Sequence, residues 1–173
     1  MSKVIKCKLD VDSLDKAISE LETYQEELMS KLESFVDALL SVGVAEASGR
    51  ASSYAGDSKP AKVIAEYVLK SKDKLLATIS LVGEDAIFIE FGAGIYYNNG
   101  NFHPKGAELG YTIGSYPSEH PPNRAIKPGF WWYKGSDGGP HLSLGTQATM
   151  PIYFASETKR NNAMQKALEI FRS

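Results

Sequence analysis

The most constraining feature of the sequence is a regular apolar seam near its N-terminus. Seven apolar residues recur there at alternating steps of four and three: Leu14, Ile18, Leu21, Leu28, Leu32, Phe35 and Leu39. Gln25 occupies the one polar step in this series. Such spacing places all of these residues on one side of an α-helix. We expect a long helix over residues 12–41, with Asp12 as its N-cap, Asp15 in its first turn and Gly43 at its end.

A helix of this length extends about 40 Å and overhangs a small domain. Its seam must pack within the chain, against a sheet for example, or against another copy of the chain, and the sequence leaves both options open. The rest of the helix is acidic, and we select Glu22, Glu26 and Glu27 as a candidate acidic face. Basic residues gather at the chain ends: Lys3, Lys6, Lys8, Lys159, Arg160, Lys166 and Arg172. Opposite patches can dock copies head to tail, although a charged face can also be merely solvated.

Residues 62–91 carry three alternating apolar sets that predict strands. The sets are Val63, Ala65, Tyr67 and Leu69; Leu75, Ala77, Ile79 and Leu81; and Ile87, Ile89 and Phe91. Turn residues at 71–73 and 83–85 separate them, so the simplest arrangement is an antiparallel β-meander. We expect one face of this sheet to pack on a helix.

Residues 92–145 differ in character from the rest of the chain. They hold eleven of the fifteen glycines, six of the eight prolines, both tryptophans and all three histidines. We expect a glycine- and aromatic-rich insertion with some short extended pieces, serving as a binding or assembly surface. Regular structure resumes in a C-terminal helix over 149–172, with Pro151 in its first turn. The predicted fold is therefore α+β, in a single domain over residues 1–173.

Composition excludes several classes of protein. A content of 43% hydrophobic and 23% charged residues indicates a globular chain, and a net charge of −2 provides no global field for nucleic acid or an anionic membrane. The lone Cys7 cannot form an internal disulfide. No apolar run reaches the roughly 20 residues of a membrane span, and the N-terminus lacks a signal-peptide pattern, so we expect a soluble intracellular protein.

The sequence offers little catalytic or cofactor chemistry. His103, His120 and His141 are too far apart for a zinc motif, and Tyr97 replaces the third glycine of a dinucleotide-binding pattern that would start at Gly92. We therefore predict no catalytic, cofactor-binding or metal site. Glu90 is a conceivable general base without a partner at motif spacing. We expect its carboxylate to accept hydrogen bonds from N–H groups of the following turn or from an arginine.

Aromatic residues are dense in the insertion, and they have three possible uses. Rings at such positions serve local packing, a protein interface, or stacking on sugars or bases. The candidate turn and interface residues are Glu90, Phe91, Gly92, Gly94, Tyr96, Tyr116, Trp131, Trp132 and Tyr133.

Several segments, taken in order, resemble one known family. They are residues 88–96 (FIEFGAGIY), 114–117 (GSYP), His120, 131–133 (WWY), 145–148 (GTQA) and the Met150-Pro151 pair. In this order the chain resembles the HK97 gp10-like family of phage and prophage tail-component proteins, over most of its length. Glu90, Phe91, Gly92 and Gly94 match the family's EFGTG-like turn, in which Ala93 replaces the common threonine.

The resemblance implies a small α+β structural protein of tail completion or head–tail joining, without enzymatic activity. It implies contacts with other neck and tail proteins and a ring of copies around the tail axis. Before assembly, the protein is either monomeric or already oligomeric. Such a protein resides in the host bacterial cytoplasm during assembly and then in the virion. An acidic helix facing the lumen of a ring would repel DNA. Neutralising Glu22, Glu26 and Glu27 would then slow genome passage while leaving assembly intact.

Two other functions remain open from the residues alone. A carbohydrate-binding module would use the rings of residues 130–133, and glycan binding lost in Trp132→Ala would favour it. A small hydrolase would use Glu90 and His120, provided that the fold brings both within about 3 Å of one substrate atom.

Overall fold

The computed structural model has the long helix, antiparallel strands and C-terminal helix of the predicted α+β fold. The structure describes residues 4–53, 61–71, 74–92, 103–110, 131–134, 137–143 and 145–172.

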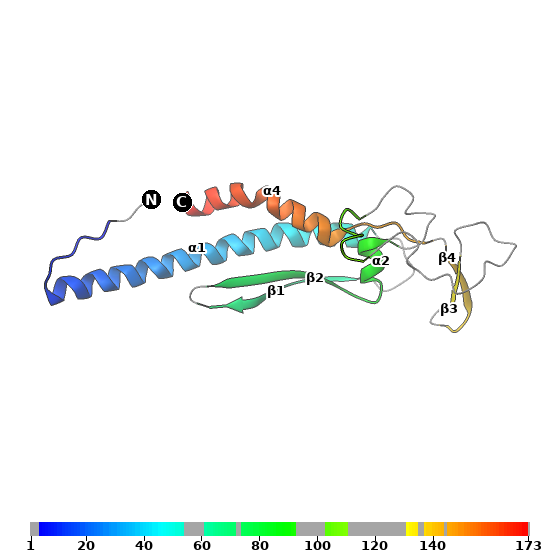
Figure 1. Ribbon diagram of the computed structural model, residues 1–173, viewed down its shortest axis with the longest axis horizontal. Helices are drawn as coiled ribbons and strands as arrows, with labels where there is room; N and C mark the ends of the chain where they lie inside the picture. Colours follow the sequence, from blue (N-terminus) through cyan, green and yellow to red (C-terminus); the bar gives the residue numbers. More distant parts are fainter. Residues whose placement is uncertain are drawn as a thin grey trace.

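Two antiparallel helices form the framework on which the rest of the molecule packs (Figure 1). Helix α1 spans Val11–Ser52, and α4 spans Pro151–Arg172 and lies along the C-terminal half of α1. The Phe35 and Phe171 rings meet edge to face with centroids 6.1 Å apart, and the Arg50 guanidinium lies 3.5 Å from the centroid of the Phe154 ring. The Phe35 contact lies on the C-terminal part of the predicted seam, where Leu32, Phe35 and Leu39 are half-buried.

The predicted helix is confirmed, but both of its predicted ends are wrong. Asp10, rather than Asp12, is the N-cap, and its carboxylate accepts a hydrogen bond of 2.9 Å from the Ser13 N–H. Gly43 lies buried within the helix instead of ending it. A Cβ atom on Gly43 would lie 2.5 Å from Ile79 Cδ1 and 3.0 Å from Lys159 Cδ. This glycine therefore permits close packing against β2 and α4, and its helix-breaking tendency is overridden.

Strands β1 (Lys62–Lys70) and β2 (Leu75–Val82) form an antiparallel hairpin. The hairpin lies along α1, on the side away from α4 in Figure 1. Two polar contacts tie its outer end to the helix. The Tyr67 hydroxyl donates to Asp37 Oδ1 at 2.7 Å, and Lys70 Nζ donates to Glu33 Oε2 at 2.9 Å.

The third strand of the predicted meander is wrong. Residues Ala86–Phe91 form the short helix α2, so the sheet over 62–91 has two strands. A short apolar run fits a strand or a buried helix equally well by periodicity. The neighbours Ile89 and Glu90 are both buried here, which a strand packed on one face cannot achieve because its side chains alternate.

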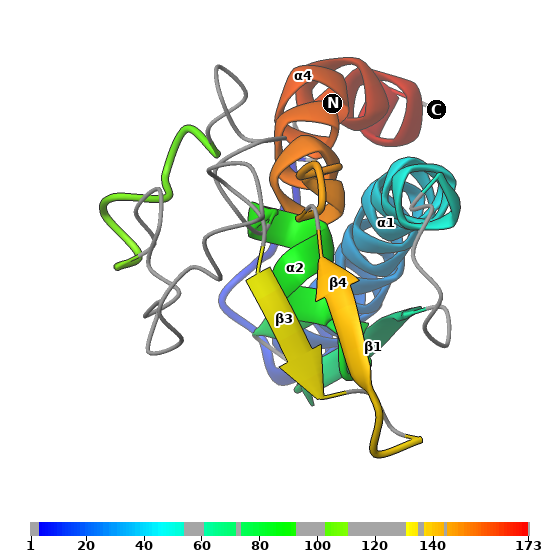
Figure 2. The same ribbon diagram turned by 90° about the vertical axis from the view of Figure 1, so that its right-hand side faces the viewer.

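Described parts of the insertion include the short extended pieces that we predicted. Strands β3 (Trp131–Lys134) and β4 (Pro140–Ser143) pair as a second antiparallel hairpin at the end of the molecule remote from the N-terminus. Figure 2 views the molecule from this end, with β3 and β4 in front of α2. The C-terminal helix is confirmed, starting at Pro151 rather than at 149.

The molecule is elongated because α1 is longer than every element that packs on it. In Figure 1 the N-terminal half of α1 projects beyond both the C-terminal end of α4 and the tip of the β1–β2 hairpin. We call residues 11–28 of this projecting half the overhang. Within the part of the chain that the structure describes, no helix is both long and apolar enough to cross a membrane.

Candidate functional site

Glu90 is the centre of a buried polar cluster that joins three segments. Its Oε2 accepts a 2.8 Å hydrogen bond from the Ile152 N–H, and its Oε1 accepts one of 2.9 Å from the Tyr153 N–H. His103 Nε2 lies 3.0 Å from the same Oε1, and both side chains are buried. Because His103 Nδ1 accepts from the Lys105 N–H at 3.1 Å, the ring proton resides on Nε2 and is donated to Glu90.

This cluster caps the start of α4. The first N–H groups of a helix have no partner within the helix, and Pro151 at the first position has none to satisfy. The Glu90 carboxylate supplies the acceptors for the next two residues, at the end where the helix dipole favours a negative charge. The Ile89 carbonyl adds to the clamp by accepting from the Thr149 N–H at 2.9 Å. Helix α2 thus holds the entry of α4 at two adjacent residues.

The prediction that the Glu90 carboxylate accepts hydrogen bonds is confirmed, but its predicted partners are wrong. Its carboxylate accepts backbone N–H groups, but these belong to α4 and not to the glycine turn beside it. Its side-chain partner is His103, for which the sequence carries no signal, because the pairing depends on how residues 103–110 fold back. His120, the predicted partner in a hydrolase, lies outside the described residues.

An open groove of about 550 Å³ lies beside this cluster. Apolar side chains from β2, α2, residues 103–110 and α4 line most of it, and Lys105 and Arg160 lie among them. The rings of Phe91 and His103, which both line the groove, are tilted by 45° to each other, with centroids 4.6 Å apart. Glu90 and His103 also line the groove, but they are hydrogen-bonded to each other. The described lining of the groove is therefore mainly apolar.

The other turn and interface candidates are placed unevenly. Phe91 and Gly92 lie beside Glu90, and Gly92 ends α2 with φ 75°, a backbone conformation that favours glycine. Gly94, Tyr96 and Tyr116 lie outside the described residues. Trp131, Trp132 and Tyr133 are placed as the backbone of β3, and the positions of their rings are not among the described features. Among the described residues, no group of three or more His, Cys, Asp or Glu side chains could hold a metal ion.

The overhang is the second candidate surface. The seam residues Leu14, Ile18, Leu21 and Leu28 are 42%, 53%, 55% and 39% exposed, respectively. Of the acidic candidates, Glu22 and Glu26 follow Asp15 along one edge of this stripe at steps of seven and four, and all three are exposed. Glu27 and Glu20 lie toward the other side of the helix. By helical spacing, Glu22 and Glu26 therefore lie closer to the apolar stripe than Glu20 and Glu27 do.

Comparison with known proteins identifies no relative of this chain. No protein-family model, curated protein or solved structure matches the chain. The function must therefore be argued from the surfaces themselves and from the order of the sequence motifs.

Proposed function

We propose that this chain is a structural protein of a phage or prophage virion that acts in tail completion or head–tail joining through protein–protein contacts. One observation carries the proposal. The overhang exposes four large aliphatic side chains on a stretch of helix that no other described helix or strand covers, with only residues 4–10 running back beside it. Contiguous exposed apolar surface of this kind is typical of a site where another protein binds.

The arrangement around Glu90 supports a role without catalysis. Its two oxygens accept three hydrogen bonds, two of them from the backbone of α4. A general base needs an oxygen directed at a substrate proton, and here both oxygens are engaged in holding helices together.

The resemblance to the HK97 gp10-like family supplies the setting for these contacts. Under this proposal the partners are other neck and tail proteins and further copies of the chain, arranged as a ring around the tail axis. The protein then resides in the bacterial cytoplasm until it joins the virion. DNA passes through the ring without being bound.

Deletion of the coding gene from the phage or prophage tests the proposal. We expect filled heads and finished tails to accumulate unjoined in electron micrographs after induction, and a plasmid copy of the gene to restore complete particles. Normal particles from the deletion strain would refute the proposal. If they instead failed only to adsorb, and purified protein bound glycans in a manner lost in Trp132→Ala, the carbohydrate-binding alternative would replace it.

A further inference from the structure

The apolar seam of α1 runs along the helix with one polar step, at Gln25, but α4 covers only its C-terminal part. Within the chain, α4 packs on the seam at Phe35 through Phe171, and its helix ends one residue later at Arg172. The stripe then continues from Leu28 to Leu14 with the same spacing and without a covering helix. The overhang is therefore an extension of an established helix-packing interface, and its spacing is suited to another helix.

Charge restricts which helix can fill this position. Asp15, Glu22 and Glu26 line one edge of the stripe, and the first and last are 11 residue steps apart, or about 16 Å of helix. A second overhang packed antiparallel would bring the same acids against these and would be repelled. The fitting partner is a helix with exposed apolar residues flanked by basic ones.

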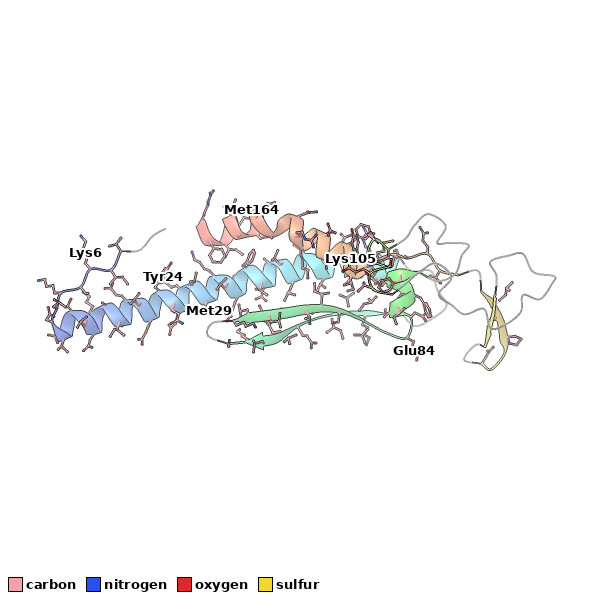
Figure 3. All side chains as sticks on the ribbon, in the orientation of Figure 1. Lys6, Tyr24, Met29, Glu84, Lys105 and Met164 are labelled. Atoms are coloured by element: carbon pink, nitrogen blue, oxygen red, sulfur yellow. The ribbon has the colours of Figure 1, made fainter. Side chains whose placement is uncertain are left out.

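The outer side of α4 has this composition. Arg160, Met164, Leu168 and Arg172 follow one another at steps of four, so they form one row along the helix. Met164 is 72% and Leu168 is 40% exposed, and both arginines are exposed. Figure 3 shows Met164 on the side of α4 that faces away from α1. The ends of the row are 12 residue steps apart, about 18 Å, which is close to the length of the acidic edge.

We infer that copies of this chain associate head to tail, with the overhang of one copy packed on the Arg160–Met164–Leu168–Arg172 row of the next. The apolar pair Met164 and Leu168 covers the stripe around Ile18 and Leu21, and the two arginines approach the acidic edge. Arg160 already pairs with Glu157, but its side chain is 70% exposed, so exchanging that partner costs little. The contact deepens the proposed function, on which it rests, by naming the partner of the overhang.

When two copies bind through two different surfaces, the pair still has one free overhang and one free row. It therefore propagates, and it closes into a ring where the rotation between copies allows. This property separates it from a symmetric dimer and provides the test.

Two surface variants of the full chain, each with one surface disabled, test the contact by sedimentation velocity. Ile18→Glu with Leu21→Glu disables the overhang, and Arg160→Glu with Met164→Glu disables the row. We expect the wild type to form oligomers that weaken at high ionic strength, and each variant alone to associate at least roughly tenfold more weakly. An equal mixture of the two variants should form 1:1 dimers and nothing larger, because each contributes its one intact surface.

Val68→Glu provides the matched control. Val68 is 56% exposed on β1, away from both surfaces, and its replacement should leave association unchanged. Helix content by circular dichroism should be the same in all variants, because every altered side chain is exposed.

Three results would overturn the inference: a wild type that stays monomeric at low ionic strength, a row variant that assembles like the wild type, or a mixture without dimers. The deletion experiment reads particle joining and not self-association, so unjoined heads and tails together with a monomeric protein would refute this contact alone.

Discussion

At the scale of single residues, the Glu90 carboxylate connects parts of the chain that are remote in sequence. It bridges α2, the segment at His103 and the first turn of α4. A buried acceptor with three donors is costly to remove, because each donor then remains buried without a partner.

Replacing Glu90 tests this structural role. In Glu90→Gln one oxygen becomes an NH₂ group that faces a donor, so we expect the free energy of unfolding to fall by about 1–3 kcal/mol. Urea denaturation measures the change. Glu157→Gln, at a half-buried position of α4, is the control and should change it by less than about 0.5 kcal/mol. An unchanged stability in Glu90→Gln would mean that the cluster does not hold α4.

Tyr67 provides a pH-dependent test of the hairpin contact. Its hydrogen bond to Asp37, with smaller effects from burial and nearby acids, raises the pKa of the phenol from 10.0 to about 12. The folded pKa exceeds the unfolded one, so the contribution to stability is complete below about pH 10 and disappears as the pH rises through 12. We expect stability to decline more steeply between pH 10 and 12 in the wild type than in Tyr67→Phe. Parallel pH profiles of the two proteins would contradict the contact.

At the scale of elements, helix α1 contains two glycines with opposite environments. Gly43 is buried against Ile79 and Lys159, whereas a Cβ on Gly49 would meet nothing within 4 Å. The same substitution should therefore act differently at the two positions, which makes them a matched pair.

Gly49→Ala should stabilise the protein by about 0.5–1 kcal/mol, because alanine favours the helix and fills open space. Gly43→Ala gains the same preference but overpacks the junction of α1, β2 and α4, so we expect it to be less stable than Gly49→Ala by about 1–3 kcal/mol. Thermal unfolding followed by circular dichroism measures both. Equal stabilisation in the two variants would show that Gly43 is not needed for close packing.

At the scale of the whole molecule, the long α1 places acidic side chains on two sides. Glu22 and Glu26 border the stripe, whereas Glu20 and Glu27 lie on the other side and are exposed or half-buried. If the second pair faces the lumen of a ring, it repels DNA phosphates and keeps the genome from adhering.

Phage carrying Glu20→Gln and Glu27→Gln should assemble normally but eject DNA more slowly, by a factor that shrinks at high ionic strength. Ejection kinetics after receptor triggering measure the rate, and Glu66→Gln on β1 is the control. An ejection rate equal to that of the wild type would place this side of the helix outside the lumen.

Local sequence patterns were sufficient to predict the elements that are long enough to show a clear periodicity of apolar residues. The spacing from Leu14 to Leu39 predicted the long helix, and the alternation on either side of the 71–73 turn predicted the hairpin. The prediction of a third strand failed, because six residues are too few for periodicity to separate a helix from a strand. The prediction that Gly43 ends the helix was also wrong, because the role of this glycine depends on the distant residues Ile79 and Lys159.

The sequence by itself determined that the chain folds as an α+β protein around a long amphipathic helix, because both features follow from contacts between near neighbours. Only the tertiary structure decided where that helix is covered. Its α4 partner ends beside Phe35, and this leaves the stripe from Leu14 to Leu28 open. Likewise only the fold joined Glu90 to His103 and to the start of α4. Such pairings depend on the relative placement of segments distant in the chain, which no local spacing encodes.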